Sequence, residues 1–397
     1  MQLRDFGKTG VKVSPIGFGM MRLPADAEGN VDEERAIAML RSAIDNGLNY
    51  VDTAFNYHNG NSEKITGKAL LDGYRDKVYL ATKAPAWMFK SGDDFDTILD
   101  KQLERLQTDH IDFYLLHAMN AIAFEKKVQR YGVLERLEAA RAAGKIKYVG
   151  FSFHDKLDVF KNICDSYDWD FCQIQLNYID TVYQAGIEGL KYAASKGMGV
   201  AIMEPLRGGY LANVPKAVAD VFAPTGKTAV EWGLPERAEA VLKGYAPGES
   251  AASWAIRFAQ SQKHVNIVLS GMSDEEQIRQ NLEYASRSSA GMFTAEDEDV
   301  IKRVQGIFNS YDTISCTGCS YCLPCPKNVG IPYNFVVYNN YKTGSPFEDE
   351  KKRYNEWVTV FGQKASACVA CHKCEEICPQ HLKISDLLKK VAETFEG

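Results

Sequence analysis

The sequence predicts a (β/α)8 barrel followed by a small cysteine-rich domain. Short apolar segments rich in β-branched and aromatic residues alternate eight times with segments of helical periodicity. Eight of the ten cysteines then fall in two runs near the C-terminus. We therefore expect the barrel to cover residues 1–310 and the small domain residues 311–397. A chain of 397 residues with 45% hydrophobic content is long enough to bury a large core.

The eight apolar segments are expected to be parallel strands. They are almost continuously apolar, which is typical of a sheet buried on both faces, and eight strand–helix units favour a closed barrel. A doubly wound sheet is the alternative, but the first strand runs into GFGMMRLP and lacks the glycine-rich dinucleotide motif. The expected strands are 16–20, 48–52, 78–84, 111–117, 148–153, 171–178, 200–204 and 265–271, and the clearest helices are 32–46 (with Asp32 as N-cap), 62–71, 94–107 and 133–143.

Three segments are expected to lie outside the repeating units. Residues 2–15, with a KTG turn, are predicted to form a hairpin across the floor of the barrel. Residues 206–248 are too long for an ordinary loop and are predicted to form an inserted lid or docking element. Residues 331–367 separate the cysteine runs and are expected to be helical.

Charge and composition argue against several classes of protein. The net charge of −6 comes from interspersed acidic and basic residues, so the basic surface that nucleic acid requires is not expected. No apolar run approaches the ~18 residues of a membrane helix. The opening MQLRDFGKTG lacks the apolar stretch of a signal peptide. We therefore expect a soluble, cytoplasmic protein with reduced thiols.

The two cysteine runs predict a pair of [4Fe–4S] clusters. Their spacings are C-x2-C-x2-C-x2-C-P and C-x2-C-x2-C-x3-C-P, and the second is similar to that of bacterial two-cluster ferredoxins. In those proteins three cysteines of a run bind one cluster, and the cysteine before proline binds the other. The likeness implies one set of Cys316, Cys319, Cys322 and Cys378, and a second set of Cys368, Cys371, Cys374 and Cys325.

Disulfide bonds and structural zinc are the alternatives for these cysteines. Disulfides need an oxidising compartment, which the start of the chain does not indicate. Zinc needs only two close cysteine pairs, whereas a third cysteine follows each pair here, which suits a cluster better. Cys164 and Cys172 stand alone in apolar surroundings and are expected to be core thiols.

Four reactive side chains are expected at the carboxyl ends of the barrel strands, where this fold carries chemistry. Asp52, Lys83 and His117 end the second, third and fourth expected strands. Tyr57 follows in the loop after Asp52. The tyrosine would donate a proton to a carbonyl oxygen, the lysine would favour the phenolate, and the aspartate would hold the lysine. Singly, each of these residues is often only structural.

Eight segments between residues 6 and 281 carry a family resemblance. They are FGKTGVKVSPIGFG (6–19), NYVDTAFNYHNGNSEKITGKAL (49–70), VYLATK (78–83), IDFYLLH (111–117), KIKYVGFS (145–152), CQIQLNY (172–178), EPLRGG (204–209) and VLSGMSDEEQIRQN (268–281). They resemble the aldo/keto reductase superfamily, and with the tail included the chain resembles an iron–sulfur subgroup of it. This implies a barrel that binds NADP(H) or NAD(H), with Asp52, Tyr57, Lys83 and His117 as catalytic tetrad and Tyr57 as general acid.

The same resemblance implies a set of cofactor contacts. Ser152 and Gln173 would meet the nicotinamide carboxamide, and Met203 stands where many members stack a tyrosine. Gln277 replaces an arginine that often grips the 2′-phosphate, so NADP(H) is only modestly favoured over NAD(H). The expected contacts are Gly19, Met20, Asp52, Ser152, Gln173, Met203, Leu206, Arg207, Ser270, Gly271, Met272, Gln277 and Asn281.

Two functions from different classes are expected. The leading one is an oxidoreductase that interconverts a small-molecule carbonyl and an alcohol by hydride transfer, with the clusters carrying electrons. The alternative is an electron-transfer or scaffold protein whose barrel binds a nicotinamide or flavin without turnover, and FMN is the less favoured cofactor. A ferredoxin or flavoprotein is a candidate redox partner. His58 and Trp87 are candidate walls of the substrate pocket.

Overall fold

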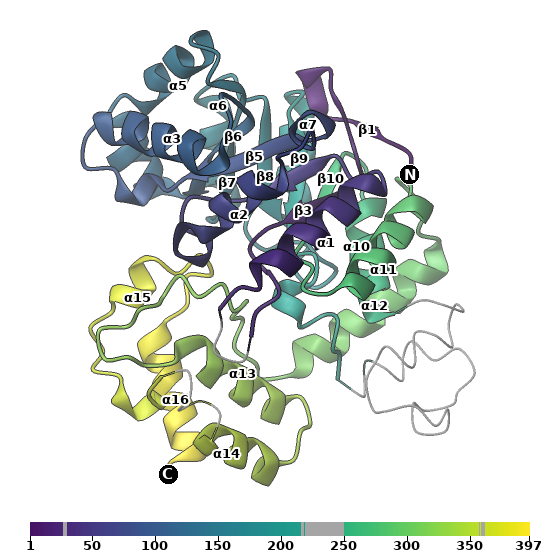
Figure 1. The fold of residues 1–397 in the computed structure, drawn as a ribbon. Coiled ribbons are helices and arrows are strands. Elements are labelled where there is room, and N and C mark those ends of the chain that lie inside the picture. Colours follow the sequence, from purple (N-terminus) through teal and green to yellow (C-terminus); the bar gives the residue numbers. More distant parts are fainter. Residues whose placement is uncertain (27–29, 216–217, 219–249, 357, 359–361) are drawn as a thin grey trace. The chain divides into compact units, whose positions relative to one another are not determined.

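The computed structural model describes residues 1–397 except 27–29, 216–217, 219–249, 357 and 359–361 (Figure 1). Two compact units make up the chain. The barrel unit comprises Met1–Pro205 and Ser253–Thr294, and the C-terminal unit comprises Leu206–Ala252 and Ala295–Gly397. The boundary expected near residue 310 stays a prediction, and most of the predicted insertion at 206–248 lies outside the described residues.

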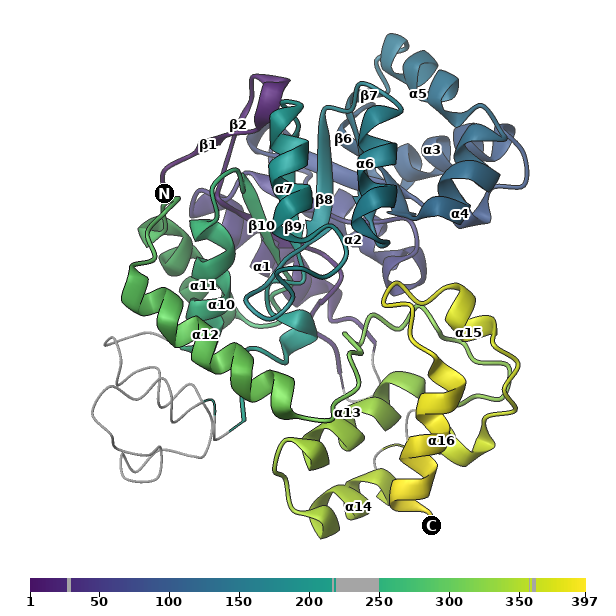
Figure 2. The same cartoon turned by 180° about the vertical axis from the view of Figure 1, so that it is seen from behind.

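Eight parallel strands close into a barrel in the order β10-β3-β4-β5-β6-β7-β8-β9, which confirms the predicted fold (Figures 1 and 2). Consecutive strands are neighbours, as expected when each strand is joined to the next by a helix on the outside. The strands are β3 (Ile16–Gly19), β4 (Tyr50–Asp52), β5 (Tyr79–Ala84), β6 (Ile111–Met119), β7 (Ile146–Phe153), β8 (Phe171–Gln175), β9 (Gly199–Met203) and β10 (Ile267–Ser270).

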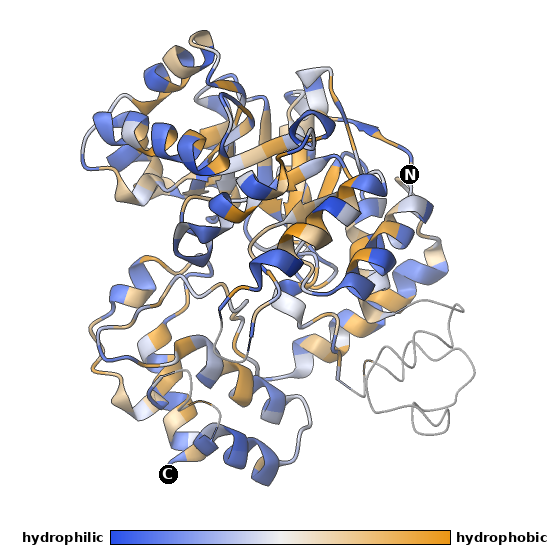
Figure 3. Cartoon of the chain, in the orientation of Figure 1, coloured by the Kyte–Doolittle hydropathy of each residue, from blue (hydrophilic) through white to orange (hydrophobic). Residues whose placement is uncertain are grey.

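A helix follows every barrel strand, and its apolar side faces the sheet while its polar side faces outward (Figure 3). Helix α1 begins after Asp32, whose carboxylate accepts the Arg35 N–H at 3.1 Å, as the sequence predicts. The helices of this layer are α1 (Glu33–Asp45), α2 (Asn61–Ala69), α3 (Asp93–Leu106), α4 (Ala121–Ala123), α5 (Val133–Ala142), α6 (Leu157–Asp165), α7 (Gly186–Ser195), α10 (Ala251–Ser261) and α11 (Glu275–Arg287). Short helical turns are η1 (Gly7–Thr9), η2 (Tyr57–Gly60), η3 (Arg75–Lys77), η4 (Ala86–Met88) and the π-helical η5 (Phe124–Gln129).

The predicted hairpin closes one end of the barrel. Strands β1 (Arg4–Asp5) and β2 (Lys12–Val13) pair antiparallel, and Phe6 between them is fully buried. The Phe6 ring lies 5.0 Å from that of Phe113 in an edge-to-face arrangement. A side chain at Gly199 would overlap this ring, since a Cβ there would lie 2.6 Å from it. The floor of the barrel is therefore filled by a side chain from outside the sheet.

The strand register brings the expected reactive residues to the opposite end. Asp52 is the last residue of β4 and pairs with Gly19 and Ala81. His117 lies in an irregular stretch of β6 where the register against β7 shifts between Leu116 and Met119. Such irregularities re-aim side chains at the ends of barrels. His117 thus lies within the shifted part of the register.

The C-terminal unit packs helices and loops around a separate core. The helical prediction for the segment between the cysteine runs is confirmed by two helices, α13 and α14. Its core includes the rings of Tyr354 and Phe395, stacked at 4.9 Å. The elements are η6 (Arg207–Gly209), α12 (Ala295–Ser310), α13 (Ile331–Lys342), α14 (Phe347–Glu356), η9 (Ala365–Ala367), α15 (Lys373–Glu376) and α16 (Ile384–Phe395). Among the described residues, no helix is long and apolar enough to cross a membrane.

Candidate active site and cysteine sites

The structure brings Asp52, Tyr57 and Lys83 together in the barrel. Lys83 is fully buried, and its ammonium donates to Asp52 Oδ1 at 2.5 Å and to the Thr53 carbonyl at 2.7 Å. The distance from Lys83 Nζ to the Tyr57 hydroxyl is 3.4 Å. The Tyr57 ring also faces the His117 ring edge-on at 5.8 Å between centroids. All four residues of the expected tetrad therefore lie in one place.

Burial and charge set the ionisation of this group. Burial raises the pKa of Asp52, and the Lys83 ammonium opposes that shift. Burial alone would lower the pKa of Lys83, but the adjacent Asp52 and Tyr57 outweigh it and raise the pKa. Burial, followed by the Lys83 and His154 charges, lowers the pKa of His117 well below 6.5. The site therefore holds a charged lysine and a neutral histidine.

Two buried acceptors of the expected cofactor set have no hydrogen-bond partner among the described residues: Gln173 Oε1 and Asp52 Oδ2. Unsatisfied buried acceptors are rare, and such atoms suit a ligand that brings donors. A nicotinamide carboxamide brings an NH2 group and its ribose brings hydroxyls. Ser152 accepts the Ala118 N–H at 2.8 Å, so its hydroxyl hydrogen remains able to donate. These residues fit a nicotinamide nucleoside.

The other expected contacts differ in what they can offer. Asn281 donates to Ser270 Oγ at 3.0 Å and thus holds the Ser270–Met272 turn, in which Met272 is fully buried. Met203 Sδ lies 3.6 Å from Gln173 Nε2.

The remaining expected contacts lie in other surroundings. Gln277 caps α11 by accepting the Ser273 N–H at 2.9 Å. Gly19 lies against the Ser270 carbonyl, and Met20 is fully buried with its N–H bonded to the Asp52 carbonyl. Leu206 and Arg207 belong to the C-terminal unit.

Of the two expected pocket walls, Trp87 lies at the site. Its ring is 5.1 Å from that of His117, and 36% of the residue is exposed. His58 instead bonds the Met21 carbonyl through Nε2 at 3.0 Å.

Sequence reasoning missed two residues near these positions. His154 is buried directly after the end of β7, and a histidine that follows an expected strand is a signal that was available. Arg22 packs its side chain against Gly271, where an added Cβ would lie 2.8 Å away. The contact is made by the Cβ and Cγ of Arg22, so a basic residue borders the Ser270–Met272 turn although Gln277 is not one.

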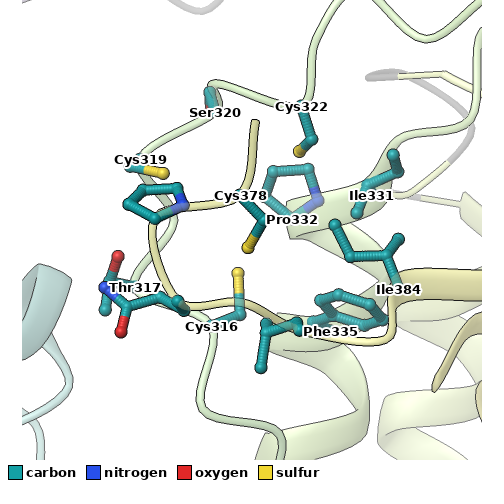
Figure 4. A pocket seen from close by; sticks show the side chains of 13 residues that line it. Cys316, Thr317, Cys319, Ser320, Cys322, Ile331, Pro332, Phe335, Cys378 and Ile384 are labelled. Carbon is teal, nitrogen blue, oxygen red and sulfur yellow. The ribbon is translucent and has the colours of Figure 1, made fainter. Parts of the chain in front are cut away.

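The first cysteine run and Cys378 line one pocket in the C-terminal unit (Figure 4). Cys316, Cys319 and Cys322 come from the loop before α13, and Cys378 comes from the loop before α16. Burial raises the pKa of Cys322, and the nearby Cys319, Cys316 and Cys378 add to the shift. The structure therefore gathers the first set that the ferredoxin likeness implies.

Three cysteines of the second set, Cys325, Cys368 and Cys374, lie near one another. Burial raises the pKa of Cys374 to about 11, and Cys368 and Cys325 contribute further through their charge. A parallel bridge between Val329 and Gln363 ties the chain just after Cys325 to the chain just before Cys368. Cys371 is exposed. The assignment of ligands stays a prediction, but the crossed grouping matches the placement of the thiols.

The two runs also share a backbone conformation. The Gly318 N–H donates to Cys316 Sγ at 3.4 Å, and the Ala370 N–H donates to Cys368 Sγ at 3.5 Å. Gly318 and Ala370 both have positive φ, of 66° and 50°. N–H groups that point at sulfur stabilise a thiolate, so both loops suit anionic sulfur ligands. Cys164 and Cys172, by contrast, are buried in the barrel unit, and burial raises the pKa of both.

No three or more of the described Cys, His, Asp and Glu side chains converge as ligands of a single metal ion.

Two family models match separate segments of this chain. The aldo/keto reductase family model matches residues 15–298. The chain belongs to the aldo/keto reductase family. A 4Fe-4S dicluster domain model matches residues 315–382, so the protein is an oxidoreductase of this family with a C-terminal iron–sulfur domain.

Relatives extend over the barrel but not the whole chain. The protein is 29% identical over 317 residues to L-galactose dehydrogenase of Arabidopsis thaliana, covering 77% of this chain and 94% of that protein. The holo form of aldo-keto reductase AKR11C1 from Bacillus halodurans has a TM-score of 0.59 at 25% identity, covering 77% of this chain and 96% of that one. An aldo/keto reductase from Klebsiella pneumoniae in complex with NADP and acetate has a TM-score of 0.59 at 23% identity, covering 76% and 94%.

Proposed function

We propose that the barrel interconverts a small carbonyl compound and its alcohol, with Tyr57 as general acid. The observation that carries this proposal is the contact chain from Asp52 through the buried Lys83 ammonium to the Tyr57 hydroxyl. When bound, a reduced nicotinamide supplies the hydride. Tyr57 donates its proton to the carbonyl oxygen as that oxygen gains charge, and Lys83 stabilises the phenolate left behind.

The remaining residues of the site orient the reactants. Asp52 keeps Lys83 charged and in place, because an unpaired ammonium is costly to bury. Neutral His117 can donate one N–H to the same carbonyl oxygen. The exposed edge of Trp87 offers an apolar wall, which suits a small substrate without a charge near its carbonyl. Gln173 and Ser152 would hold the carboxamide of a bound nicotinamide.

NADP(H) and NAD(H) both fit this proposal, with NADP(H) favoured. The side chain of Gln277 is engaged in capping α11. Arg22, whose Cβ and Cγ pack against Gly271, is the candidate partner for a phosphate group. A neighbour in fold is described with bound NADP, which is consistent with this choice.

For the C-terminal unit we propose two [4Fe–4S] clusters, held by the two crossed sets of four cysteines. Such clusters exchange single electrons when bound. A ferredoxin or a flavoprotein is the class of partner that exchanges single electrons with them. The alternative in which the barrel only binds nucleotide is an outcome of the following test.

The test is anaerobic turnover with Tyr57→Phe. With methylglyoxal and NADPH, and with L-galactose and NADP⁺, kcat should fall by about 10²- to 10⁴-fold while NADPH still binds, because only the proton donor is lost. Tyr148→Phe is the matched control, since its hydroxyl donates to the Thr9 carbonyl at the barrel floor. If the parent turns over neither these nor other carbonyls while binding NADPH, the non-catalytic alternative holds. Undiminished turnover in Tyr57→Phe would refute the role of Tyr57.

A further inference from the structure

A buried polar cluster lies in the barrel wall behind Lys83 and Tyr57. Its members are hydrogen-bonded to one another, and none belongs to the expected tetrad or the expected cofactor contacts. Glu63, Thr82, Gln102 and Tyr114 are fully buried, and the Arg105 side chain is 13% exposed. We call these five residues the Glu63 cluster. Burying a carboxylate and a guanidinium is costly, so such a pair calls for a role besides stability.

Glu63 is the centre of the cluster. Its Oε1 accepts hydrogen bonds from Thr82 Oγ1 and Gln102 Nε2, each at 2.7 Å. Its Oε2 accepts one from Arg105 at 3.0 Å. Tyr114 completes the arrangement by donating to Gln102 Oε1 at 2.7 Å. Both carboxylate oxygens are therefore occupied, and each amide atom of Gln102 has a partner.

The cluster reaches the backbone on both sides of the reacting groups. Gln102 Nε2 donates to the Lys83 carbonyl at 3.1 Å. Arg105 donates to the Phe55 carbonyl at 2.9 Å and lies 4.3 Å from the centre of the Phe55 ring. Phe55 N–H in turn donates to the Lys83 carbonyl at 3.3 Å. The loop that carries Tyr57 and the strand that carries Lys83 are thus bound to one carboxylate.

Gly60 shows how closely the loop that carries Tyr57 packs against Arg105 of the Glu63 cluster. Its φ is +87°, and an added Cβ would lie 2.7 Å from the Arg105 guanidinium. Only a glycine allows the loop to close over the arginine in this conformation. The packing leaves the loop between Phe55 and Gly60 little room to shift.

We infer that Glu63 is a positioning residue for the reaction, because it holds Gln102 and Arg105 and so fixes the separation of Lys83 Nζ from the Tyr57 hydroxyl. This inference rests on the proposed function of the barrel. Proton transfer is sensitive to such distances, and a displacement of about 1 Å can cost about 10²-fold in rate. Nucleotide binding uses other residues and should not depend on the cluster.

The test compares Glu63→Gln with a matched buried carboxylate elsewhere. Asp112 is 3% exposed, pairs with Arg75 at 2.8 Å and is the second residue of β6, at the floor of the barrel. In the full-length protein with its clusters, Glu63→Gln should lower kcat for methylglyoxal by about 10- to 100-fold, with KM and NADPH affinity within about twofold. Asp112→Asn should lower the melting temperature and leave kcat within about twofold.

A double variant separates position from stability. Glu63→Gln combined with Arg105→Gln removes the unpaired charge, so the melting temperature should recover relative to Glu63→Gln while kcat stays low. If kcat recovers with the melting temperature, or if Glu63→Gln keeps the parental kcat, the inference is overturned.

If Glu63→Gln does not fold, the Tyr114→Phe variant tests the inference instead, because it removes one hydroxyl and no charge. It should slow kcat severalfold, and a parental kcat would again overturn the inference.

Tyr57→Phe, measured beside these variants, distinguishes the two proposals. Parental turnover in Tyr57→Phe would remove the proposed mechanism itself. An inactive Tyr57→Phe together with a fully active Glu63→Gln would remove only the positioning role.

Discussion

At the scale of single residues, the barrel contains buried polar atoms that have no hydrogen-bond partner among the described residues and that a bound ligand could pair with. Gln173 Oε1 is buried without a hydrogen-bond partner among the described residues, in the middle of β8. Leaving an acceptor unsatisfied costs about 1–3 kcal/mol, which a ligand donor would recover. The unpaired atom supports a binding contact at Gln173 only together with the resemblance that places Gln173 among the cofactor contacts, since other buried polar atoms of the described residues are also unpaired.

Replacing Gln173 should weaken nucleotide binding specifically. Gln173→Leu removes the acceptor for the carboxamide, so we expect NADPH to bind about 5- to 10-fold more weakly, as for a hydrogen bond of about 1 kcal/mol. Fluorescence titration under anaerobic conditions measures this. Gln260→Leu is the control, since Gln260 is also buried with an unpaired Oε1 but donates to the Pro15 carbonyl where β3 begins. Equal affinity in both variants would exclude the carboxamide contact.

His117 should remain neutral throughout the working range of pH. Its pKa lies well below 6.5 because of burial first and of Lys83 and His154 second. The unfolded chain binds a proton at this histidine near pH 6.5 and the folded protein does not, so stability falls as pH drops through about 6.5. Melting curves from about pH 5 to 8 should show this decline, and His117→Asn should reduce it. An unchanged decline in that variant would assign it to other groups.

At the scale of secondary structure, the β1–β2 hairpin and the carboxyl ends of the barrel strands have separate roles. The rings of Phe6, Phe113 and Phe171 pack together at the floor, while the reactive residues lie at the other end of the strands. Barrel folds separate stability and chemistry in this way. Loss of the floor should therefore affect folding and spare catalysis.

Phe6→Ala tests this division. Removing a fully buried phenylalanine ring leaves a cavity, and we expect a loss of about 3–5 kcal/mol in the free energy of unfolding. Urea denaturation measures the loss, and kcat at a temperature where the variant is folded should match the parent. A large fall in kcat at full folding would show that the floor and the rim are coupled.

At the scale of the whole molecule, a two-electron site and one-electron sites share one chain. Protein purified without oxygen should contain about eight iron and eight acid-labile sulfide per chain, four of each per cluster. Under the crossed arrangement, Cys378→Ser should lose the cluster of the first run and Cys325→Ser that of the second. Spectroscopic loss of the cluster next to each mutated cysteine in sequence would favour uncrossed sets, and zinc without sulfide would exclude clusters.

We further expect NADPH alone to reduce the clusters slowly. A nicotinamide gives up two electrons as hydride, whereas each cluster accepts one, and plant-type ferredoxin potentials near −400 mV illustrate how low such acceptors can lie. Anaerobic addition of NADH or NADPH to flavin-free protein should leave the brown absorbance nearly unchanged over the time of several turnovers. Added free flavin should accelerate bleaching. Prompt bleaching without flavin would show direct coupling.

The sequence by itself determined the barrel, the tetrad and the two groups of cysteines. Strand and helix periodicities are local, and each of Asp52, Lys83 and His117 sits at a strand end that parallel topology must bring to one rim. Cysteine spacing is likewise local and reflects the size of the ligand it surrounds. These features could be predicted because the information lies within a few residues along the chain.

Only the tertiary structure showed which buried polar atoms lack a hydrogen-bond partner among the described residues. It alone also showed which residues far apart in the sequence are hydrogen-bonded to one another. Glu63 lies 39 positions from Gln102 and 42 from Arg105, and no local pattern marks their contact. Arg22 meets Gly271 across nearly the whole barrel sequence, and Gln277 turns out to cap its own helix. Such contacts depend on closing the sheet into a barrel. Whether a buried polar atom is satisfied is decided only by what the rest of the chain brings to it.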